Sequence, residues 1–321
     1  MEYRKLGKSG LAVSEVALGS WLTFGSSVDQ ESTTATVRKA WDLGINLFDT
    51  ADVYARGDGE RALGNALKGF ERKDYVLASK CFFPMSDNPN DAGLSRKHIH
   101  ESIDQSLRRL QTDYLDLYQC HRFDPETPIL ETAQAMNDLC KQGKILYWGV
   151  SCWTGKQIQE VADLCADHGL VPPISNQPPY SLFNRSIEEE VIPSSQKNGL
   201  GQIVFSPLAQ GVLTGKYRVD QAAPEGSRAQ DTERNKFMLK YMGKAHLQAA
   251  SEIAEIARDL EIPPAGLALA WCLRKNNVAS VIVGATRPEQ LVENTRASGF
   301  KIPQDRLEKI DAILESLPKI D

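Results

Sequence analysis

The sequence lacks the features that attract nucleic acid or membranes. Its formal net charge at pH 7 is −5, and no run of Lys and Arg could follow a phosphate backbone. No apolar stretch approaches the roughly 20 residues that a helix needs to cross a bilayer. The first residues also lack the apolar core of a signal peptide. We therefore expect a cytoplasmic protein with no nucleic-acid partner and no membrane insertion.

Cysteine is sparse and scattered. The pattern has neither the close pairing of a zinc site nor the density of a small disulfide-stapled domain. His98 and His100 are two residues apart on an expected helix and would project about 200° from each other, so they make no metal pair. We expect no metal site and interpret all six cysteines as reduced thiols: Cys81, Cys120, Cys140, Cys152, Cys165 and Cys272.

Apolar runs alternate with segments of helical period along the 321 residues. This alternation is typical of parallel strands joined by crossover helices. Eight such units predict an α/β fold, a (β/α)8 TIM barrel in a single domain over residues 1–321, and an open doubly wound sheet is the alternative. The expected strands are Val16–Gly19, Ile45–Asp49, Tyr75–Lys80, Tyr114–His121, Ile145–Ser151, Ile174–Gln177, Gly201–Ser206 and Ser280–Gly284.

Further segments flank this pattern. The residues from Tyr3 to Ser14 predict an N-terminal β-hairpin that could plug one end of the barrel. Residues 207–244 show no strand, and a loop of this length is expected to fold over a ligand. Thr127 followed by Pro128 predicts a helix N-cap with proline at the first helical position. The expected helices after the loop, including extra ones near the C-terminus, are Ala245–Leu260, Pro264–Arg274, Pro288–Ser298 and Gln304–Leu317.

Three consecutive expected strands end in Asp49, Lys80 and His121. The C-terminal strand ends of such a barrel carry the active site, and neighbouring strands are about 4.8 Å apart, so these side chains can form one site. Because successive side chains on a strand alternate, an inward His121 places Cys120 toward the helices. This argues against a nucleophile–base pair of Cys120 and His121.

The stretch Ile45-Asn46-Leu47-Phe48-Asp49-Thr50-Ala51-Asp52-Val53-Tyr54, followed by Glu60 and Leu63-Gly64, resembles the aldo-keto reductase signature. Residues 19–25, 93–99 and 268–274 resemble the branch that contains voltage-gated potassium channel β subunits. The resemblance covers essentially the whole chain. It implies a catalytic tetrad of Asp49, Tyr54, Lys80 and His121, the cofactor NADPH/NADP+ and a small-molecule carbonyl substrate.

The chemistry of these side chains agrees with that activity. Carbonyl reduction needs a hydride, which no side chain donates, and a proton for the developing alkoxide. We predict that Lys80 lowers the pKa of Tyr54 from about 10 by roughly two to three units. Asp49 would keep Lys80 protonated, and His121 would hydrogen-bond the carbonyl oxygen.

The resemblance also implies an extended NADP site over the barrel mouth. Trp21 would lie near the nicotinamide, with Ser151 and Gln177 on its carboxamide side. The remaining contacts would be Ser206, Pro207, Leu208 and Ala209 along the ribose and pyrophosphate, Lys216 and Arg228 at phosphates, and Gly284, Thr286, Gln290, Glu293 and Asn294 at the 2'-phosphate and base.

The turn Thr286-Arg287-Pro288 itself favours an anion, because free N–H groups begin the next helix. Arg287 would be the main cation there, since Gln290 is uncharged where the family often has Arg. The segment Gly57-Asp58-Gly59-Glu60-Arg61-Ala62 matches G-x-G-x-x-A. However, the next strand ends in Lys80 where a ribose-binding acid is expected, which disfavours a Rossmann site.

Two other functions are open. Lys80 could form a Schiff base as in aldolases, but that lysine must be deprotonated and Asp49 opposes this. The chain could also be an NADP(H)-binding accessory or redox-sensing subunit of an ion channel with little turnover. Channel β subunits carry Asn at the position of His121, and their longer forms have an N-terminal inactivating segment. This sequence has His121 and begins two residues before Tyr3, and we expect both features to favour a working reductase. We expect substrate choice to depend on Trp21, Phe82, Phe83, Trp153 and residues 207–243. The sequence leaves open whether the chain forms a homo-oligomer.

Overall fold

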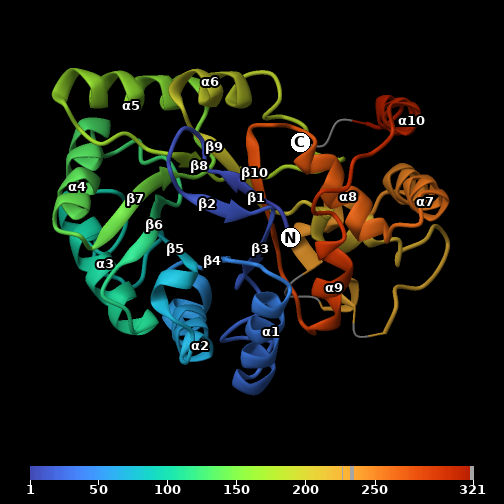
Figure 1. Ribbon diagram of the computed structural model, residues 1–321, viewed down its shortest axis with the longest axis horizontal. Coiled ribbons are helices and arrows are strands. Elements are labelled where there is room, and N and C mark those ends of the chain that lie inside the picture. The colour runs from blue at the N-terminus through green and yellow to red at the C-terminus, as the bar shows by residue number, and fades with distance from the viewer. Residues whose placement is uncertain (226, 232–234, 319–321) are drawn as a thin grey trace.

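Eight parallel strands close into a barrel in the computed structural model, which describes residues 1–225, 227–231 and 235–318 (Figure 1). Strand β10 pairs with both β9 and β3, so the sheet has no open edge and the doubly wound alternative is wrong. The predicted TIM barrel is confirmed. In neighbour order its strands are β10 (Val278–Val283), β3 (Val16–Gly19), β4 (Leu47–Asp49), β5 (Val76–Cys81), β6 (Leu115–Cys120), β7 (Ile145–Val150), β8 (Ser175–Asn176) and β9 (Gly201–Val204).

Helices surround the barrel. They are α1 (Gln30–Asp42), α2 (Asp58–Leu67), α3 (Arg96–Leu110), α4 (Ile129–Lys141), α5 (Gly155–His168), α6 (Val191–Asn198), α7 (Lys244–Asp259) and α8 (Pro264–Leu273), with α9 (Glu289–Thr295) and α10 (Gln304–Glu315) after β10. The predicted extra helices near the C-terminus are therefore confirmed. The predicted N-cap at Thr127 is wrong, because Pro128 takes the capping position of α4 and the Thr127 hydroxyl donates to Asp124 instead.

The barrel strands are buried on both faces, as parallel barrel strands are, except near the start of β7, where Leu146 is 47% exposed. Leu47, Ala78 and Leu117 pack in a cluster inside the barrel, whereas Cys120 packs in the larger cluster between strands and helices. The predicted orientation of Cys120 toward the helices is confirmed. All six cysteines are free thiols.

The N-terminal hairpin closes one end of the barrel. Strands β1 (Tyr3–Lys5) and β2 (Ala12–Ser14) pair antiparallel, and Leu6 and Val13 join the inner cluster. Backbone N–H groups of the hairpin donate to Gly199 just before β9 and to Asn46 just before β4, so the hairpin covers the N-terminal strand ends. In Figure 1 it crosses the ring of strands. The C-terminal ends remain as the place for a site.

Between Pro207 and Lys244 the described residues form no strand, only short 3₁₀ turns at Ala209–Thr214, Arg228–Gln230, Asn235–Phe237 and Leu239–Tyr241. Three more 3₁₀ residues precede β5 at Arg72–Asp74, and Tyr54–Gly57 forms another such turn after β4. The Phe237 ring packs edge-on against Trp21 with 5.0 Å between ring centroids, so the long segment reaches the loop after β3.

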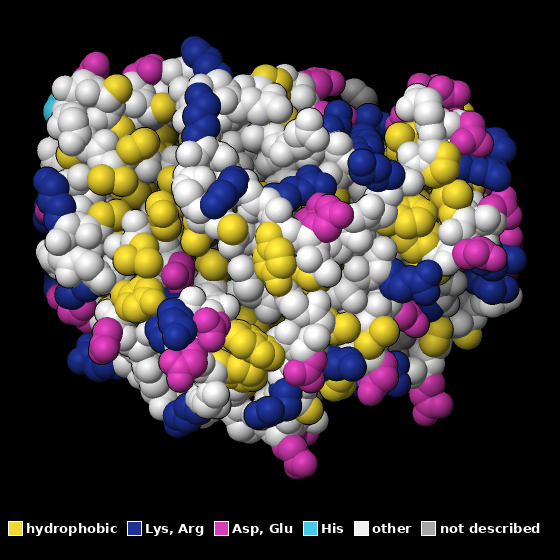
Figure 2. Space-filling view, viewed as in Figure 1, with side chains coloured by type: hydrophobic (Ala, Val, Ile, Leu, Met, Phe, Trp, Pro, Cys, Tyr) yellow, Lys and Arg dark blue, Asp and Glu magenta, His cyan; other side chains and the backbone are white. Residues whose placement is uncertain are grey.

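The surface shows no dominant charge on the face in Figure 2, where Lys and Arg side chains are interspersed with Asp and Glu. In the described parts of the chain, no helix has the length and apolarity to cross a membrane.

Gly64 sets the distance between α2 and α3. A Cβ at this position would lie 2.7 Å from the carbonyl oxygen of Leu110 and 2.8 Å from its Cα. We predict that Gly64→Ala lowers the free energy of unfolding by about 1–3 kcal/mol through overpacking, although alanine favours helix more than glycine. Urea denaturation measures this. Gly10→Ala is the control, because no atom lies within 4 Å of its added Cβ; equal stability of the two variants would contradict the prediction.

Candidate active site

Four of the predicted residues meet at the C-terminal end of the barrel. Asp49 ends β4, Lys80 is the penultimate residue of β5, and His121 directly follows β6. Tyr54 lies on the 3₁₀ turn after β4, and its hydroxyl is 3.4 Å from the Lys80 Nζ. The Tyr54 and His121 rings pack edge-to-face with 5.6 Å between centroids.

Lys80 is the centre of this cluster. Its side chain is 0% exposed, and its Nζ donates to Asp49 Oδ2 at 2.7 Å and to the Thr50 carbonyl oxygen at 2.7 Å. Burial opposes the charge of Lys80, but Asp49 and Tyr54 outweigh it and raise the pKa of the ammonium. A Schiff base requires the neutral amine, so this geometry opposes the aldolase alternative.

The predicted lowering of the Tyr54 pKa is wrong, although Lys80 itself acts in the predicted direction. Burial raises the pKa of the Tyr54 phenol, and the attraction of the Lys80 ammonium offsets this only in part. The reason is that a phenolate here would lose its hydration, while the charge of Lys80 is shared with Asp49. Tyr54 is therefore a neutral phenol at neutral pH.

His121 is only 6% exposed and packs edge-to-face against Phe83, with 5.0 Å between ring centroids. Burial, and then the charges of Lys80 and Arg122, lower the pKa of His121 well below its usual value. Its Nδ1 is buried and has no hydrogen-bond partner among the described residues. A neutral imidazole at this position has one N–H to donate.

Ser151 and Gln177 connect to the same cluster. Gln177 Nε2 donates to the second oxygen of Asp49, Oδ1, at 2.9 Å. The Ser151 hydroxyl donates to the backbone oxygen of Gln177 at 2.7 Å. The ends of β4, β7 and β8 are therefore linked by hydrogen bonds.

The stretch after β9 has an unusual backbone. Ser206, Ala209 and Gln210 have positive φ angles of 54°, 46° and 60°, and Pro207 and Leu208 lie between them. Such strained residues cluster at functional sites. Gln210 Nε2 donates to the Ser206 hydroxyl at 2.6 Å, and Arg228 donates to Gln210. Lys216 is exposed, with its Nζ 5.1 Å from the centroid of the Tyr217 ring.

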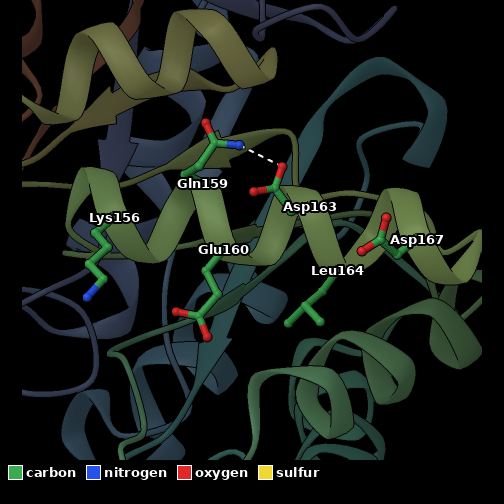
Figure 3. Close-up of a pocket in the computed structure, with 6 residues that line it drawn as sticks. All are labelled: Lys156, Gln159, Glu160, Asp163, Leu164 and Asp167. Carbon is green, nitrogen blue, oxygen red and sulfur yellow. Dashed lines mark hydrogen bonds between the residues drawn. The ribbon is translucent and has the colours of Figure 1, made fainter.

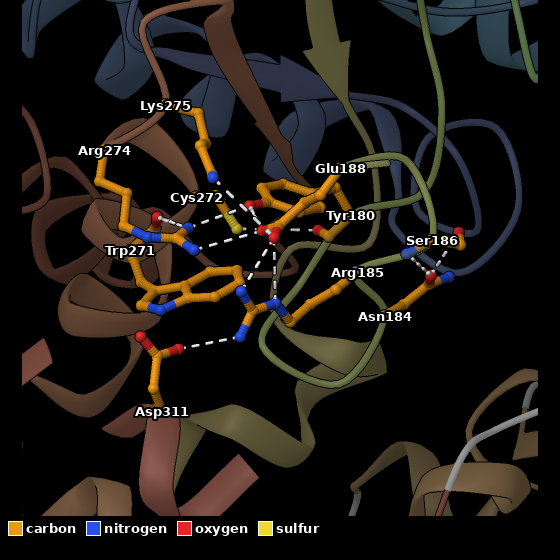
Figure 4. A network of polar contacts seen from close by, with 10 residues as sticks. All are labelled: Tyr180, Asn184, Arg185, Ser186, Glu188, Trp271, Cys272, Arg274, Lys275 and Asp311. Atoms are coloured by element: carbon orange, nitrogen blue, oxygen red, sulfur yellow. Dashed lines mark hydrogen bonds and ion pairs between the residues drawn. The ribbon is translucent and has the colours of Figure 1, made fainter. Parts of the chain in front are cut away.

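Figure 4 shows how the residues before this stretch are anchored. Tyr180 N–H donates to the Phe205 carbonyl oxygen, and the Tyr180 hydroxyl donates to Glu188. Glu188 also pairs with Arg185 at 2.9 Å and with Arg274 at 3.2 Å. Arg274 in turn stacks 3.5 Å from the centroid of the Trp271 ring. The end of β9 is thereby tied to α8.

The turn after β10 differs from prediction in one respect. The N–H groups of Thr286 and Arg287 are not free, because both donate to Gln290 Oε1, at 2.8 and 3.4 Å. Thr286 and Arg287 are exposed, as are Gly284 and Glu293, whereas Asn294 is 4% exposed. An acceptor oxygen therefore already occupies the position where an anion would bind, and Gln290 must turn away for an anion to enter.

Several of the predicted cofactor residues lie just after neighbouring strands of the barrel. Ser151, Gln177, Ser206 and Gly284 come after β7, β8, β9 and β10, which are neighbours in the barrel, and Trp21 follows β3 beside β10. Ser151 and Ser206 supply hydroxyls and Gln177 an amide at these strand ends, and the cations Lys216 and Arg228 lie on the segment that follows β9. The donor set fits an elongated anionic ligand such as a dinucleotide.

A hollow elsewhere does not belong to this site. Figure 3 shows it along the outside of α5, and all of its lining residues come from that helix: Lys156, Gln159, Glu160, Asp163, Leu164 and Asp167. Among the described residues, no group of three His, Cys, Asp or Glu side chains could hold a metal ion.

The comparison with known proteins agrees with this geometry. Residues 15–315 match the model of the aldo/keto reductase family. The chain belongs to the aldo/keto reductase family. Its relatives include a Schizosaccharomyces pombe protein, 41% identical over 98% of this chain and 94% of the relative. Proteins of Oryza sativa subsp. japonica and Arabidopsis thaliana are 40% and 41% identical, each over 99% of this chain and 98% of the relative. All three have provisional names as voltage-gated potassium channel subunit beta, the branch that the sequence motifs predicted.

A buried polar layer lies behind the tetrad of this aldo/keto reductase family member, and it was not among the predicted site residues. Asp52 and Glu60 are both 0% exposed. Asp52 accepts from the Ser102 hydroxyl at 2.9 Å, and Glu60 accepts from the Ser79 hydroxyl and from Arg109 Nε, each at 2.5 Å. The signal was available in the sequence, because Asp52 interrupts the apolar signature stretch and Glu60 follows it.

Burial, with a further contribution from the charge of Glu60, raises the pKa of Asp52 to about 7. The folded chain therefore keeps a proton that the unfolded chain loses near pH 4. Stability from this carboxyl falls as the pH rises from that value through about 7.

We predict that Asp52→Asn removes this slope. From pH 6 to pH 8 the parent chain should lose about 1 kcal/mol more unfolding free energy than the variant, measured by urea denaturation at both values. Asp113→Asn, at an exposed position, should keep the parent slope. The same slope in all three proteins would show that Asp52 is ionised in the folded chain at pH 6.

Proposed function

We propose that this chain is an NADPH-dependent carbonyl reductase, acting as one barrel domain in the cytoplasm, with Tyr54 as the proton donor. The observation that carries the proposal is the buried ammonium of Lys80, which lies 2.7 Å from Asp49 and 3.4 Å from the Tyr54 hydroxyl. This arrangement stabilises negative charge on Tyr54 at the moment when its proton leaves.

The residues along β7 to β10 would hold the nicotinamide cofactor, which supplies the hydride when bound. Ser151 and Gln177, together with Asp49, would fix the end beside Tyr54, and Trp21 would pack beside them. Ser206, Pro207, Leu208 and Ala209 would line the middle of the cofactor, with Lys216 and Arg228 as cations. Gly284, Thr286, Arg287, Gln290, Glu293 and Asn294 would surround the far end.

Tyr54, Lys80 and His121 would each have a separate role when the substrate oxygen becomes negatively charged. The Tyr54 hydroxyl gives up its proton as negative charge develops on that oxygen, because an alkoxide is a far stronger base than a phenolate. Lys80 keeps its charge throughout and lowers the energy of the phenolate that forms. Neutral His121 donates a hydrogen bond to the same oxygen and so fixes its position.

The names of the three relatives support a second candidate, an NADP(H)-binding potassium channel subunit with little turnover. His121 favours the reductase, since it provides a hydrogen-bond donor beside Tyr54. The two are separated by capturing the full chain from detergent-solubilised membranes and measuring NADPH oxidation with an aldehyde on the same sample. Co-purification with a channel and no aldehyde-dependent oxidation would favour the second candidate.

The proposal predicts that Tyr54→Phe lowers aldehyde turnover by roughly 10²- to 10⁴-fold. NADPH affinity should change little, because the substitution removes only the hydroxyl. Loss of NADPH absorbance measures turnover, and fluorescence titration measures binding. Tyr3→Phe is the matched control, since Tyr3 is 52% exposed at the opposite end of the barrel. Tyr54→Phe turnover equal to that of the control would exclude Tyr54 as the donor.

For the cofactor, we predict a preference for NADPH over NADH that depends on Arg287. One charge-assisted contact to the 2'-phosphate is worth about 1.5–3 kcal/mol, or roughly 10- to 150-fold in affinity. Arg287→Ala should weaken NADPH by this factor and spare NADH, whereas Arg296→Ala at the other end of α9 should affect neither. If both nucleotides bind the parent chain equally, or lose equal affinity in Arg287→Ala, this contact is wrong.

A further inference from the structure

One cation beside the tetrad has no role in the proposed chemistry. Arg122 follows His121 and is partly buried. Its Nη1 donates to the His121 carbonyl oxygen at 2.5 Å, and its Cζ lies 5.5 Å from the centroid of the Phe83 ring. Since Phe83 packs against the His121 ring, the guanidinium lies close to the site. Its charge also contributes, after burial and Lys80, to the lowered pKa of His121.

Arg122 differs from other partly or fully buried arginines of this chain. A buried cation is normally paired, because an unpaired charge loses its hydration without compensation. Arg4, Arg72, Arg109, Arg185, Arg274 and Arg306 each pair with a carboxylate. Across the part of the chain that the structure describes, Arg122 makes no ion pair, and its contacts are a carbonyl oxygen and an aromatic ring.

The guanidinium therefore has capacity to bind an anion. It has five N–H groups in a planar fork that matches a carboxylate, and one of its nitrogens is used by His121. Phe83 lies between the two polar ends of this region, 5.0 Å from the His121 ring and 5.5 Å from the Arg122 Cζ. Phe82 packs edge-on against Phe83 and widens this apolar wall. The geometry suits a ligand with an oxygen at His121, a flat apolar middle and an anion at Arg122.

We propose that Arg122 binds a carboxylate of the substrate, so that the preferred substrates are aldehydes or ketones carrying a carboxylate about one ring away from the carbonyl. This inference rests on the proposed reductase function and specifies its substrate class. Arg122 is a specificity residue here, because it contacts the substrate away from the reacting atoms. A bidentate pair of charge-assisted hydrogen bonds gives the carboxylate an advantage of roughly 10- to 100-fold over an uncharged ester of similar shape.

The test compares 4-formylbenzoate with its methyl ester, which have the same ring and the same aldehyde. The full chain is assayed with NADPH, and kcat/KM is measured for both compounds. The parent chain should favour the acid. Arg122→Gln should lower the ratio of acid to ester by roughly 10- to 100-fold, and Arg122→Lys, which keeps the charge but loses the fork, should give an intermediate ratio. Arg108→Gln, at an exposed position on α3, should keep the parent ratio. Equal ratios in the parent and Arg122→Gln would overturn the proposal.

A binding measurement separates this inference from the proposed function. Benzoate and methyl benzoate are titrated calorimetrically into the parent and the Arg122 variants, each with NADP+ present and each checked for folding by circular dichroism. Benzoate should bind the parent at least tenfold more tightly than Arg122→Gln, and methyl benzoate should not discriminate. If benzoate binding depends on Arg122 while neither aldehyde is reduced, the anion site stands and the reductase function fails. If the ester is reduced while benzoate binds both proteins equally, the reductase stands and the role of Arg122 is wrong.

Discussion

The ion pair between Lys80 and Asp49 is the constraint on which the site depends. Burying two charges costs more than their attraction returns unless further hydrogen bonds complete the geometry. Here the Thr50 carbonyl oxygen accepts a second bond from Lys80, and Gln177 donates to the free oxygen of Asp49. These partners come from β4, β5 and the end of β8. The hydrogen bonds of the ion pair are therefore complete only when the barrel has brought these strands together. In the proposed mechanism, Tyr54 and His121 can act on a substrate only because this ion pair is already in place.

The two ends of the barrel meet different physical demands. At the N-terminal end, the hairpin inserts Leu6 and Val13 into an apolar cluster, and this burial contributes stability. At the C-terminal end, charged and strained groups accumulate: the tetrad, the left-handed residues around Ser206, and the buried carboxyls of Asp52 and Glu60 behind them. Each is destabilising by itself and persists because packed helices hold it. The ion pairs of Glu188 with Arg185 and Arg274 help to hold the segment after β9, to which Tyr180 connects them.

Much of the fold and the meeting of Asp49, Lys80 and His121 could be predicted, because both follow from periodicity and from the rule that parallel strand ends converge. Tyr54 lies on a turn after β4 and was implied only by the resemblance to the family. The pKa of Tyr54 could not be predicted, since its direction depends on how deeply the hydroxyl is buried. The contacts of Thr127 and Gln290 could not be predicted either. In each case more than one hydrogen-bond partner lies nearby in the sequence, and the pattern does not indicate which partner is used. The bond from Ser102 to Asp52 joins residues 50 positions apart, and local patterns carry no information about such pairs.

In the proposed mechanism Lys80 acts through Tyr54, and a double-mutant cycle on the reduction step tests this coupling. Single-turnover reduction of an aldehyde by NADPH-loaded protein is measured for the parent, Lys80→Met, Tyr54→Phe and the double variant. Residues that act as one unit are strongly non-additive. The proposed coupling predicts that both single variants lose roughly 10²- to 10⁴-fold in rate and that the double variant is little slower than either. Losses that multiply in the double variant would contradict it, since Lys80 would then act independently of the Tyr54 proton.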